Sequence, residues 1–73
     1  MGRMTESWQS VPAEDVRVGD RLRLGSGQVI HVSKIEEKFM GMDAMIAFIE
    51  DTDARWYKQP MPKGTSVEVD RAG

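Results

Sequence analysis

The chain has 73 residues, of which 40% are hydrophobic and 30% charged, and its formal net charge at pH 7 is -2. This length allows one domain, which buries only about 60% of the surface that its unfolded chain exposes. The absence of cysteine excludes disulfides, thiolate metal sites and thiol catalysis, and the near-neutral charge excludes a global attraction to nucleic acid or to anionic membranes.

Residues 1–6 and 72–73 are polar and show no periodic pattern, so we expect flexible ends around a single domain at residues 7–71. The N-terminal residues contain no apolar segment typical of a signal peptide. The sequence also lacks a run of roughly 18 apolar residues, the length of a membrane span. We therefore expect a soluble protein of the cytoplasm.

The first third of the chain predicts a strand, a helical turn and a corner. A first edge strand is expected over residues 7–11, because Pro12 disfavours helical geometry at Val11. Residues 13–16 can form a single turn of helix, which is too short to stand alone. Gly19 then supplies a backbone conformation that a β-carbon disfavours, so the chain is expected to turn there.

Strict alternation over residues 20–24 predicts the next strand. It places Leu22 and Leu24 on one face and Arg21 and Arg23 on the other. Residues 25–27 (Gly-Ser-Gly) have the composition of a tight hairpin turn. Residues 28–35 are rich in β-branched side chains and predict a strand that contains a bulge.

Residues 36–50 fit two periods. Apolar residues recur at spacings of three and four, as in a helix, and also at two, as in a strand. We favour a strand, because Gly41 would destabilise a helix by about 1 kcal/mol and because residues 46–49 precede the turn-like residues 51–54. The helix remains the alternative.

The rest of the chain predicts a return strand at residues 55–59, a loop at 60–64 and a last strand at 66–70. The sequence therefore predicts a mainly β fold of five to six short antiparallel strands. A meander of such strands protects its edges by curling into a small barrel.

The extended start, the corner at Val18-Gly19-Asp20, the glycine turn, the valine-rich strand and the ending Gly64 to Arg71 resemble the small SH3-like β-barrel proteins of actinobacteria and their bacteriophages. The resemblance covers residues 8–71. It implies an SH3-like barrel encoded by a phage or prophage and located in the cytoplasm of a bacterial host.

The corner at Val18-Gly19-Asp20 is also similar to the start of the barrel domain of translation elongation factor P and to the first segment of Hint and intein domains. The loop at residues 37–43 has no lysine at its tip, as the former would require, and the chain has no catalytic cysteine for the latter. Neither activity is therefore expected.

Few residues in the chain can carry chemistry. His31 is the only histidine, and we interpret it as a solvent-facing strand residue. Glu50, Asp51 and Asp53 gather carboxylates, but their spacing departs from a Ca²⁺-binding loop, and a solvated turn is the expected structure. With no phosphate-binding loop and no catalytic triad, we expect no enzyme, no cofactor and no metal.

A methionine-rich segment is the first candidate for a binding surface. Met40, Met42 and Met45 lie within six residues, and methionine suits adaptable hydrophobic contacts. Alternation predicts that Phe39 is buried while Met40 and Met42 project. The alternative is that Phe39 and one or two methionines fill a small core.

Cations interleaved with aromatic residues at positions 55–58 are the second candidate, because such side chains can stack on bases and neutralise phosphates. Alternation places Trp56 and Tyr57 on opposite faces, so at least one of them is expected in the core.

We predict a non-enzymatic interaction module that binds a protein partner or a second copy of itself, with no membrane and no small-molecule substrate. The expected contact residues are Phe39, Met40, Met42, Met45, Trp56 and Tyr57. The alternative is a nucleic-acid-binding barrel that uses Arg21, Arg23, Lys34, Arg55 and Lys58.

Overall fold

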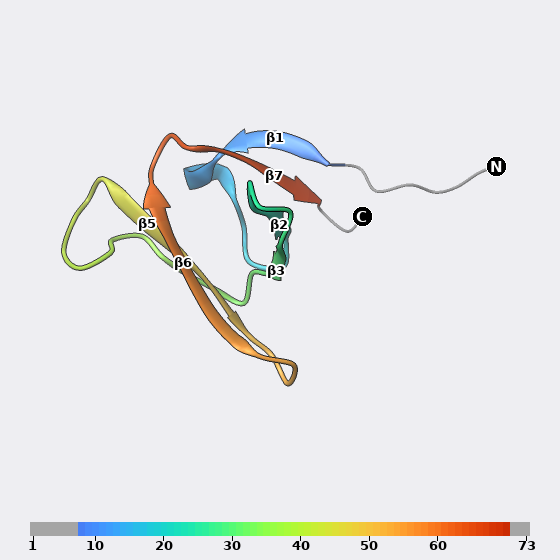
Figure 1. Ribbon diagram of the computed structural model, residues 1–73. Helices are drawn as coiled ribbons and strands as arrows, with labels where there is room; N and C mark the ends of the chain where they lie inside the picture. Colours follow the sequence, from blue (N-terminus) through green and yellow to red (C-terminus); the bar gives the residue numbers. More distant parts are fainter. Residues whose placement is uncertain (1–7, 71–73) are drawn as a thin grey trace.

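The computed structural model describes residues 8–70, which fold into two antiparallel sheets (Figure 1). Within this range there are seven strands, one 3₁₀ turn and no α-helix. The elements are β1 (Gln9–Pro12), η1 (Ala13–Asp15), β2 (Arg21–Arg23), β3 (Val29–His31), β4 (Lys34–Glu36), β5 (Met45–Asp51), β6 (Trp56–Pro62) and β7 (Ser66–Asp70). The predicted flexible segments 1–6 and 72–73 lie outside the described residues.

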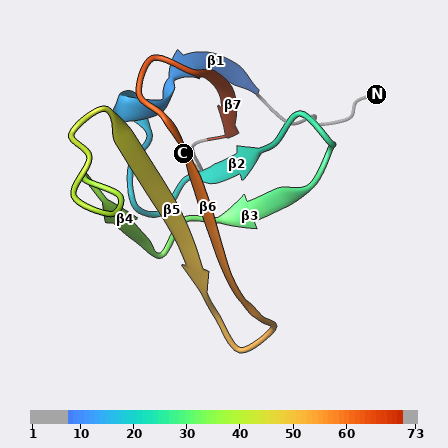
Figure 2. The ribbon, with the colours of Figure 1, turned by 60° about the vertical axis from the view of Figure 1, so that its left-hand side comes forward.

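The strands divide into a four-stranded sheet of order β1-β7-β2-β3 and a three-stranded sheet of order β4-β5-β6. Figure 2 shows the long β5–β6 ribbon crossing in front of the smaller strands. The prediction of a mainly β fold is confirmed, but the prediction of a closed barrel with five to six strands is wrong. Pro60 and Pro62 explain the open edge of β6, because proline has no N–H to donate to a closing strand.

The predicted strand at residues 28–35 is two strands, β3 and β4, which belong to different sheets. The chain changes sheets at Val32 and Ser33. The N–H of Val32 donates to the Asp20 carbonyl in the first sheet (3.0 Å), whereas the N–H of Ser33 donates to the Ile49 carbonyl in the second (2.7 Å). A corner between the sheets therefore replaces the expected bulge.

The strand alternative for residues 36–50 is confirmed only from Met45 onward, where β5 begins. Residues 37–44 form a loop, and the helix alternative is wrong. β5 pairs with β6 along its whole length. Thr52 and Arg55 exchange backbone hydrogen bonds of 3.0 and 3.2 Å, which closes the two-residue turn between the strands.

The predicted loop at residues 60–64 is also partly wrong, because Pro60 and Pro62 belong to β6. In the register of β5 and β6, hydrogen-bonded pairs alternate with pairs whose backbone groups point away from the neighbour. The bonded pair Thr52 and Arg55 fixes this alternation. Both prolines consequently fall at positions that point outward, where no N–H is needed.

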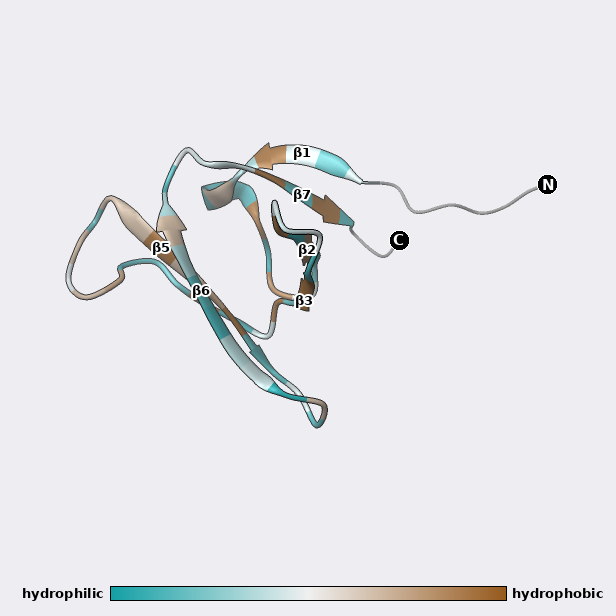
Figure 3. Ribbon diagram, in the orientation of Figure 1, coloured by the Kyte–Doolittle hydropathy of each residue, from teal (hydrophilic) through white to brown (hydrophobic). Residues whose placement is uncertain are grey.

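Apolar residues of both sheets form one buried core. Figure 3 shows hydrophobic colouring on parts of β2, β3, β5 and β7. Leu22 pairs with Ile30 on one side and with Val69 on the other, so the three form a row across the four-stranded sheet. Phe48, from β5, belongs to the same buried cluster. The five largest fully buried side chains are Phe48, Leu22, Ile30, Ile46 and Val69.

The corner before β2 forms as predicted. Gly19 has a φ of +98°, in the region that favours glycine. The buried side chain of Asp20 holds this corner, since its Oδ2 accepts the N–H of Arg17 at 2.9 Å. Arg21 and Arg23 then follow on the outer face of the sheet.

Candidate functional site

A tight turn at Met40 and Gly41 forms the tip of the methionine-rich loop, residues 37–44. Phe39 and Met42, on either side of the tip, exchange backbone hydrogen bonds of 3.4 and 3.0 Å. The residues Met40 and Met42 are 80% and 47% exposed. The prediction that these two side chains project is confirmed.

The backbone of Met40 is left-handed. Its φ is +53° and that of Gly41 is +78°, the combination that defines the type I′ turn of a two-residue hairpin. Glycine, asparagine and aspartate are preferred at these positions, because other side chains conflict with the backbone there. Met40 takes no part in the buried core, so internal packing does not account for a methionine at this position.

Phe39 lies over Lys58 of β6, whose Nζ is 5.1 Å from the centre of the ring. The same Nζ is 2.9 Å from Glu36 Oε1, which fixes the lysine over the sheet. Phe39 and Met45 are both half-buried, and neither belongs to the core between the sheets. The prediction that Phe39 is buried is therefore met only in part, and the alternative in which Phe39 and one or two methionines fill a core is wrong.

Trp56 and Tyr57 point to opposite faces of β6, as alternation predicts. Trp56 is 62% exposed, whereas Tyr57 packs against the core and donates its hydroxyl to Gln59 Oε1 at 2.9 Å. β5 runs from Met45, where the methionine-rich loop ends, to Asp51, which pairs with Trp56. At about 3.3 Å per residue, Trp56 lies roughly 20 Å from the start of β5. The structure thus places Met45 and Trp56 at opposite ends of one ribbon.

Four of the five cations predicted to contact nucleic acid form ion pairs. The pairs are Arg21–Asp70, Arg23–Glu68, Arg55–Glu50 and Lys58–Glu36. The guanidinium groups of Arg21 and Arg23 also lie over the ring of Trp8, 5.4 and 4.3 Å from its centre. Within residues 8–70, Lys34 is the one member of this set without an ion pair. Most of the positive charge is therefore neutralised locally.

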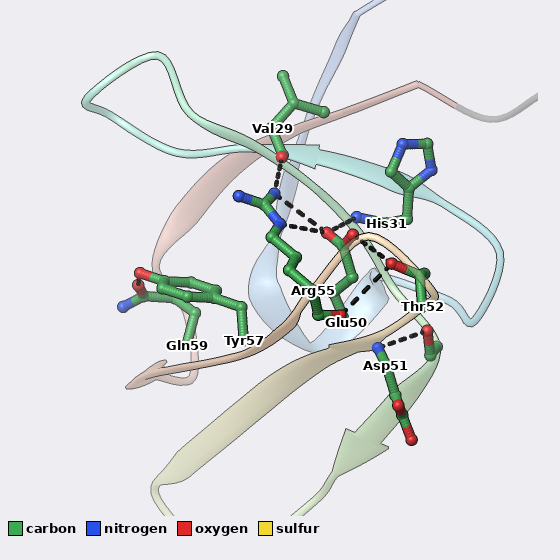
Figure 4. A network of polar contacts seen from close by, with 9 residues as sticks. Val29, His31, Glu50, Asp51, Thr52, Arg55, Tyr57 and Gln59 are labelled. Atoms are coloured by element: carbon green, nitrogen blue, oxygen red, sulfur yellow. Dashed lines mark hydrogen bonds and ion pairs between the residues drawn. The ribbon is translucent and has the colours of Figure 1, made fainter.

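A network that sequence analysis missed joins the two sheets (Figure 4). Glu50, from β5, accepts the backbone N–H of His31 at Oε1 (3.0 Å) and the Thr52 hydroxyl at Oε2 (2.9 Å). Arg55, the residue before β6, donates two N–H groups to Glu50 Oε1 at 3.0 and 3.1 Å. Its guanidinium also donates a hydrogen bond to the Val29 carbonyl. We call this network the Glu50–Arg55 clamp.

The pKa of Glu50 is lowered from 4.5 to about 2, first by the His31 N–H and then by the Arg55 guanidinium. A carboxyl group with this pKa is a poor general base near neutral pH, because it holds a proton too weakly. Its oxygens are already engaged by backbone, hydroxyl and guanidinium donors. The clamp is therefore a structural device.

The sequence placed Glu50 in a solvated turn, and this prediction is wrong, because Glu50 is only 3% exposed. Alternation along β5 does put Glu50 on the same face as Ile46 and Phe48, so a signal existed. Its backbone partner His31, however, lies on β3, 19 residues earlier. The His31 side chain is exposed, as predicted.

A cleft of about 440 Å³ opens between the sheets. Its walls come from the β2–β3 hairpin, from β6 and from the start of β7. Its polar residues include Arg23, Ser26, Gln28, Gln59, Thr65 and Ser66, and its apolar residues are Leu24, Met61 and Val67, together with Tyr57. Sequence analysis did not find this cleft, because its walls are distant in sequence.

No family model, no curated protein and no solved structure matches this chain. Within residues 8–70, no three His, Asp or Glu side chains are grouped so that they could hold a metal ion. The same residues contain no helix long and apolar enough to cross a membrane.

Proposed function

We propose that this chain is a non-enzymatic interaction module whose methionine-rich loop binds a protein partner. Met40 and Met42 form the main contact. Phe39, within the loop, and Met45, at the start of β5, support it. Trp56 adds an aromatic contact at the far end of the β5–β6 ribbon. Tyr57 makes no direct contact with the partner; it packs against the core and so fixes the position of β6.

The observation that carries this proposal is the conformation of Met40. A strained backbone angle persists when another requirement outweighs its cost, and such positions cluster at functional sites. Here a flexible apolar side chain is 80% exposed at a position where a glycine or an asparagine would fit better. Contact with a partner explains both the exposure and the choice of residue, because methionine adapts well to varied surfaces.

Aromatic residues and methionine are enriched in protein interfaces, whereas nucleic-acid interfaces depend on available positive charge. The ion pairs of Arg21, Arg23, Arg55 and Lys58 leave little such charge. This favours a protein partner over the nucleic-acid alternative.

The proposed setting follows from the sequence resemblance. We propose that the fold is an open variant of the SH3-like arrangement, encoded by an actinobacterial phage or prophage and active in the cytoplasm of its host. A second copy of the chain is the simplest partner, and a host or phage protein is the other.

The test is capture of partners from a bacterial host lysate with immobilised protein, combined with sedimentation of the pure chain. The decisive variant combines Met40→Asn and Met42→Thr, which remove the apolar contacts while keeping residues suited to a turn. We expect a captured protein, or a dimer, with the wild type and its loss with this double variant.

Val18→Thr is the matched control, because Val18 is as exposed as Trp56 but lies in the turn before β2. It should retain whatever the wild type binds. The proposal would be contradicted if the wild type, the double variant and Val18→Thr captured the same proteins and sedimented in the same way.

A further inference from the structure

The outer edge of β6 is the starting point, because β6 is the last strand of its sheet. The bonded pair Thr52 and Arg55 sets the alternation along the ribbon. Trp56, Lys58, Pro60 and Pro62 consequently direct their backbone groups away from β5. An edge of this kind is a template for another extended chain.

Half of this edge is closed within the chain itself. Pro60 and Pro62 have no N–H, and their carbonyl groups are already engaged. The Pro60 carbonyl accepts Gln59 Nε2 at 2.9 Å, and the Pro62 carbonyl accepts the Thr65 hydroxyl at 2.6 Å. This half of β6 therefore offers no donor and no free acceptor to a partner strand.

The other half is open. Among the described residues, no hydrogen bond engages the backbone N–H or C=O of Lys58 or Trp56. By contrast, the outward-facing groups of β3 are occupied by the Glu50–Arg55 clamp. The edge of β1 is only four residues long and ends at Pro12.

The cleft adjoins the open half of β6. Tyr57 and Gln59, which flank Lys58, line it from the core-facing side of the strand, and Leu24 and Val67 line the opposite wall. A volume of about 440 Å³ lies in the range of sites that hold a ligand group. Trp56 is exposed on the other face of the same strand.

We propose that the open half of β6 binds an extended peptide segment of a partner protein by strand addition. The backbone of the peptide pairs with Lys58 and Trp56, and its side chains alternate between the two faces of the sheet. One apolar side chain enters the cleft, and its neighbours pass along the face of Trp56. Main-chain hydrogen bonds supply affinity, and the cleft selects the side chain.

This peptide site shares Trp56 with the proposed function, but it does not rest on the contacts of Met40 and Met42. Substitutions in the loop leave the backbone of Lys58 unchanged, so the two proposals fail independently. A second copy of the chain that pairs edge to edge at β6 is the competing occupant.

Lys58→Pro is the decisive variant, because it removes the N–H that strand addition needs as well as the lysine side chain. Prolines already occupy the two following outward positions of β6, so the strand tolerates the ring at such a position. Lys58→Ala is the matched control. It loses the same contacts to Glu36 and Phe39 but keeps the backbone N–H.

The probe is a library of random decapeptides selected against the wild-type chain. We expect enriched peptides with apolar residues at alternate positions, which bind Lys58→Ala within about threefold of wild type and Lys58→Pro at least tenfold more weakly. In the wild type, the bound peptide should also slow hydrogen exchange of the Lys58 amide, a readout that does not depend on how the proline variant folds.

Failure to enrich any peptide would overturn the proposal, as would peptides that bind without slowing exchange at Lys58. Equal binding to the proline and alanine variants would assign the peptides to the cleft alone. Self-association of the free chain that is lost only in Lys58→Pro would assign the edge to a second copy.

Discussion

Glu50 and Arg55 form an ion pair that occupies the outer edge of β3, where a neighbouring strand would otherwise pair. The carboxylate takes the outward N–H of His31, and the guanidinium donates to the outward C=O of Val29. Two side chains thus replace the hydrogen bonds of a missing strand. They also join the three-stranded sheet to the four-stranded sheet.

Replacing Glu50 with glutamine should destabilise the fold by about 1–3 kcal/mol, because a buried network loses its charge and one acceptor. With the amide oxygen kept at the position that accepts from His31 and Arg55, the new amide donor would face the Thr52 hydroxyl. Asp51→Asn is the control, since Asp51 is the exposed neighbour, and a surface change of this kind stays within about 0.5 kcal/mol. Urea unfolding measures both, and equal midpoints for the two variants would refute a stabilising role.

The clamp also predicts how stability depends on pH. Glu50 has a pKa of about 2 in the folded state, below its ordinary value of 4.5, so the folded chain binds fewer protons than the unfolded chain between these values. Its contribution is therefore complete above about pH 4.5 and is lost as the pH falls toward 2. The pKa of Glu14 is lowered as well, through its own backbone N–H and that of Gly64, and acts in the same direction.

The measurement is the free energy of unfolding of the wild type and of Glu50→Gln from pH 7 down to about pH 2. The gap between the two chains should stay constant down to about pH 4.5 and then narrow, because the variant lacks this titrating group. Glu14 is common to both chains and cancels from the difference. A gap that does not change with pH would show that Glu50 has an ordinary pKa.

Met40→Asn should stabilise the free chain by about 0.5–1 kcal/mol, because asparagine tolerates the left-handed conformation at lower cost than methionine. Met42→Asn should give no such gain, since the φ of Met42 is negative. Thermal unfolding of the two variants checks this. A loss of stability with Met40→Asn would mean that the methionine side chain supports the fold.

The ion pairs predict weak binding to nucleic acid. Lys34 is the one candidate cation without a pair in residues 8–70, so the five candidate cations can neutralise about one phosphate without breaking a pair. The slope of log affinity against log salt should be no steeper than about -1 for single- or double-stranded oligonucleotides. Fluorescence anisotropy at two salt concentrations measures this, and a slope several times steeper would revive the nucleic-acid alternative.

Local patterns in the sequence predict the local structure well. The alternation of Arg21 to Leu24 and the glycine turn that follows give β2 and its hairpin to β3. The Val18-Gly19-Asp20 corner forms because only a residue such as glycine adopts its backbone angle readily. These features depend on neighbours in sequence, which is the information that periodicity contains.

The errors in the prediction concern contacts between distant segments. Nothing in residues 28–35 indicates that Ser33 bonds to Ile49 in a different sheet. The prolines of β6 suggested a loop, because their outward position depends on the register with β5. Glu50 appeared among the acidic residues of a turn, because its partners on β3 become neighbours only after both sheets form.

The same distinction applies to the candidate sites. Exposure of Met40 and Met42 follows from a short loop with alternating residues and was predictable. The position of Trp56, at the far end of the ribbon from Met45, can be known only from the register of β5 with β6. The cleft and the open half of β6 need the arrangement of both sheets, so sequence alone gave no indication of them.

Hydrogen exchange of individual backbone amides tests most directly the central claim that side chains close the edge of β3 while half of the β6 edge stays open. In the free wild-type chain, the His31 amide should exchange slowly and lose this protection in Glu50→Ala, which removes the acceptor, whereas the Lys58 amide should exchange fast. A fast His31 amide, or a Lys58 amide as slow as its neighbours in β6, would contradict the account.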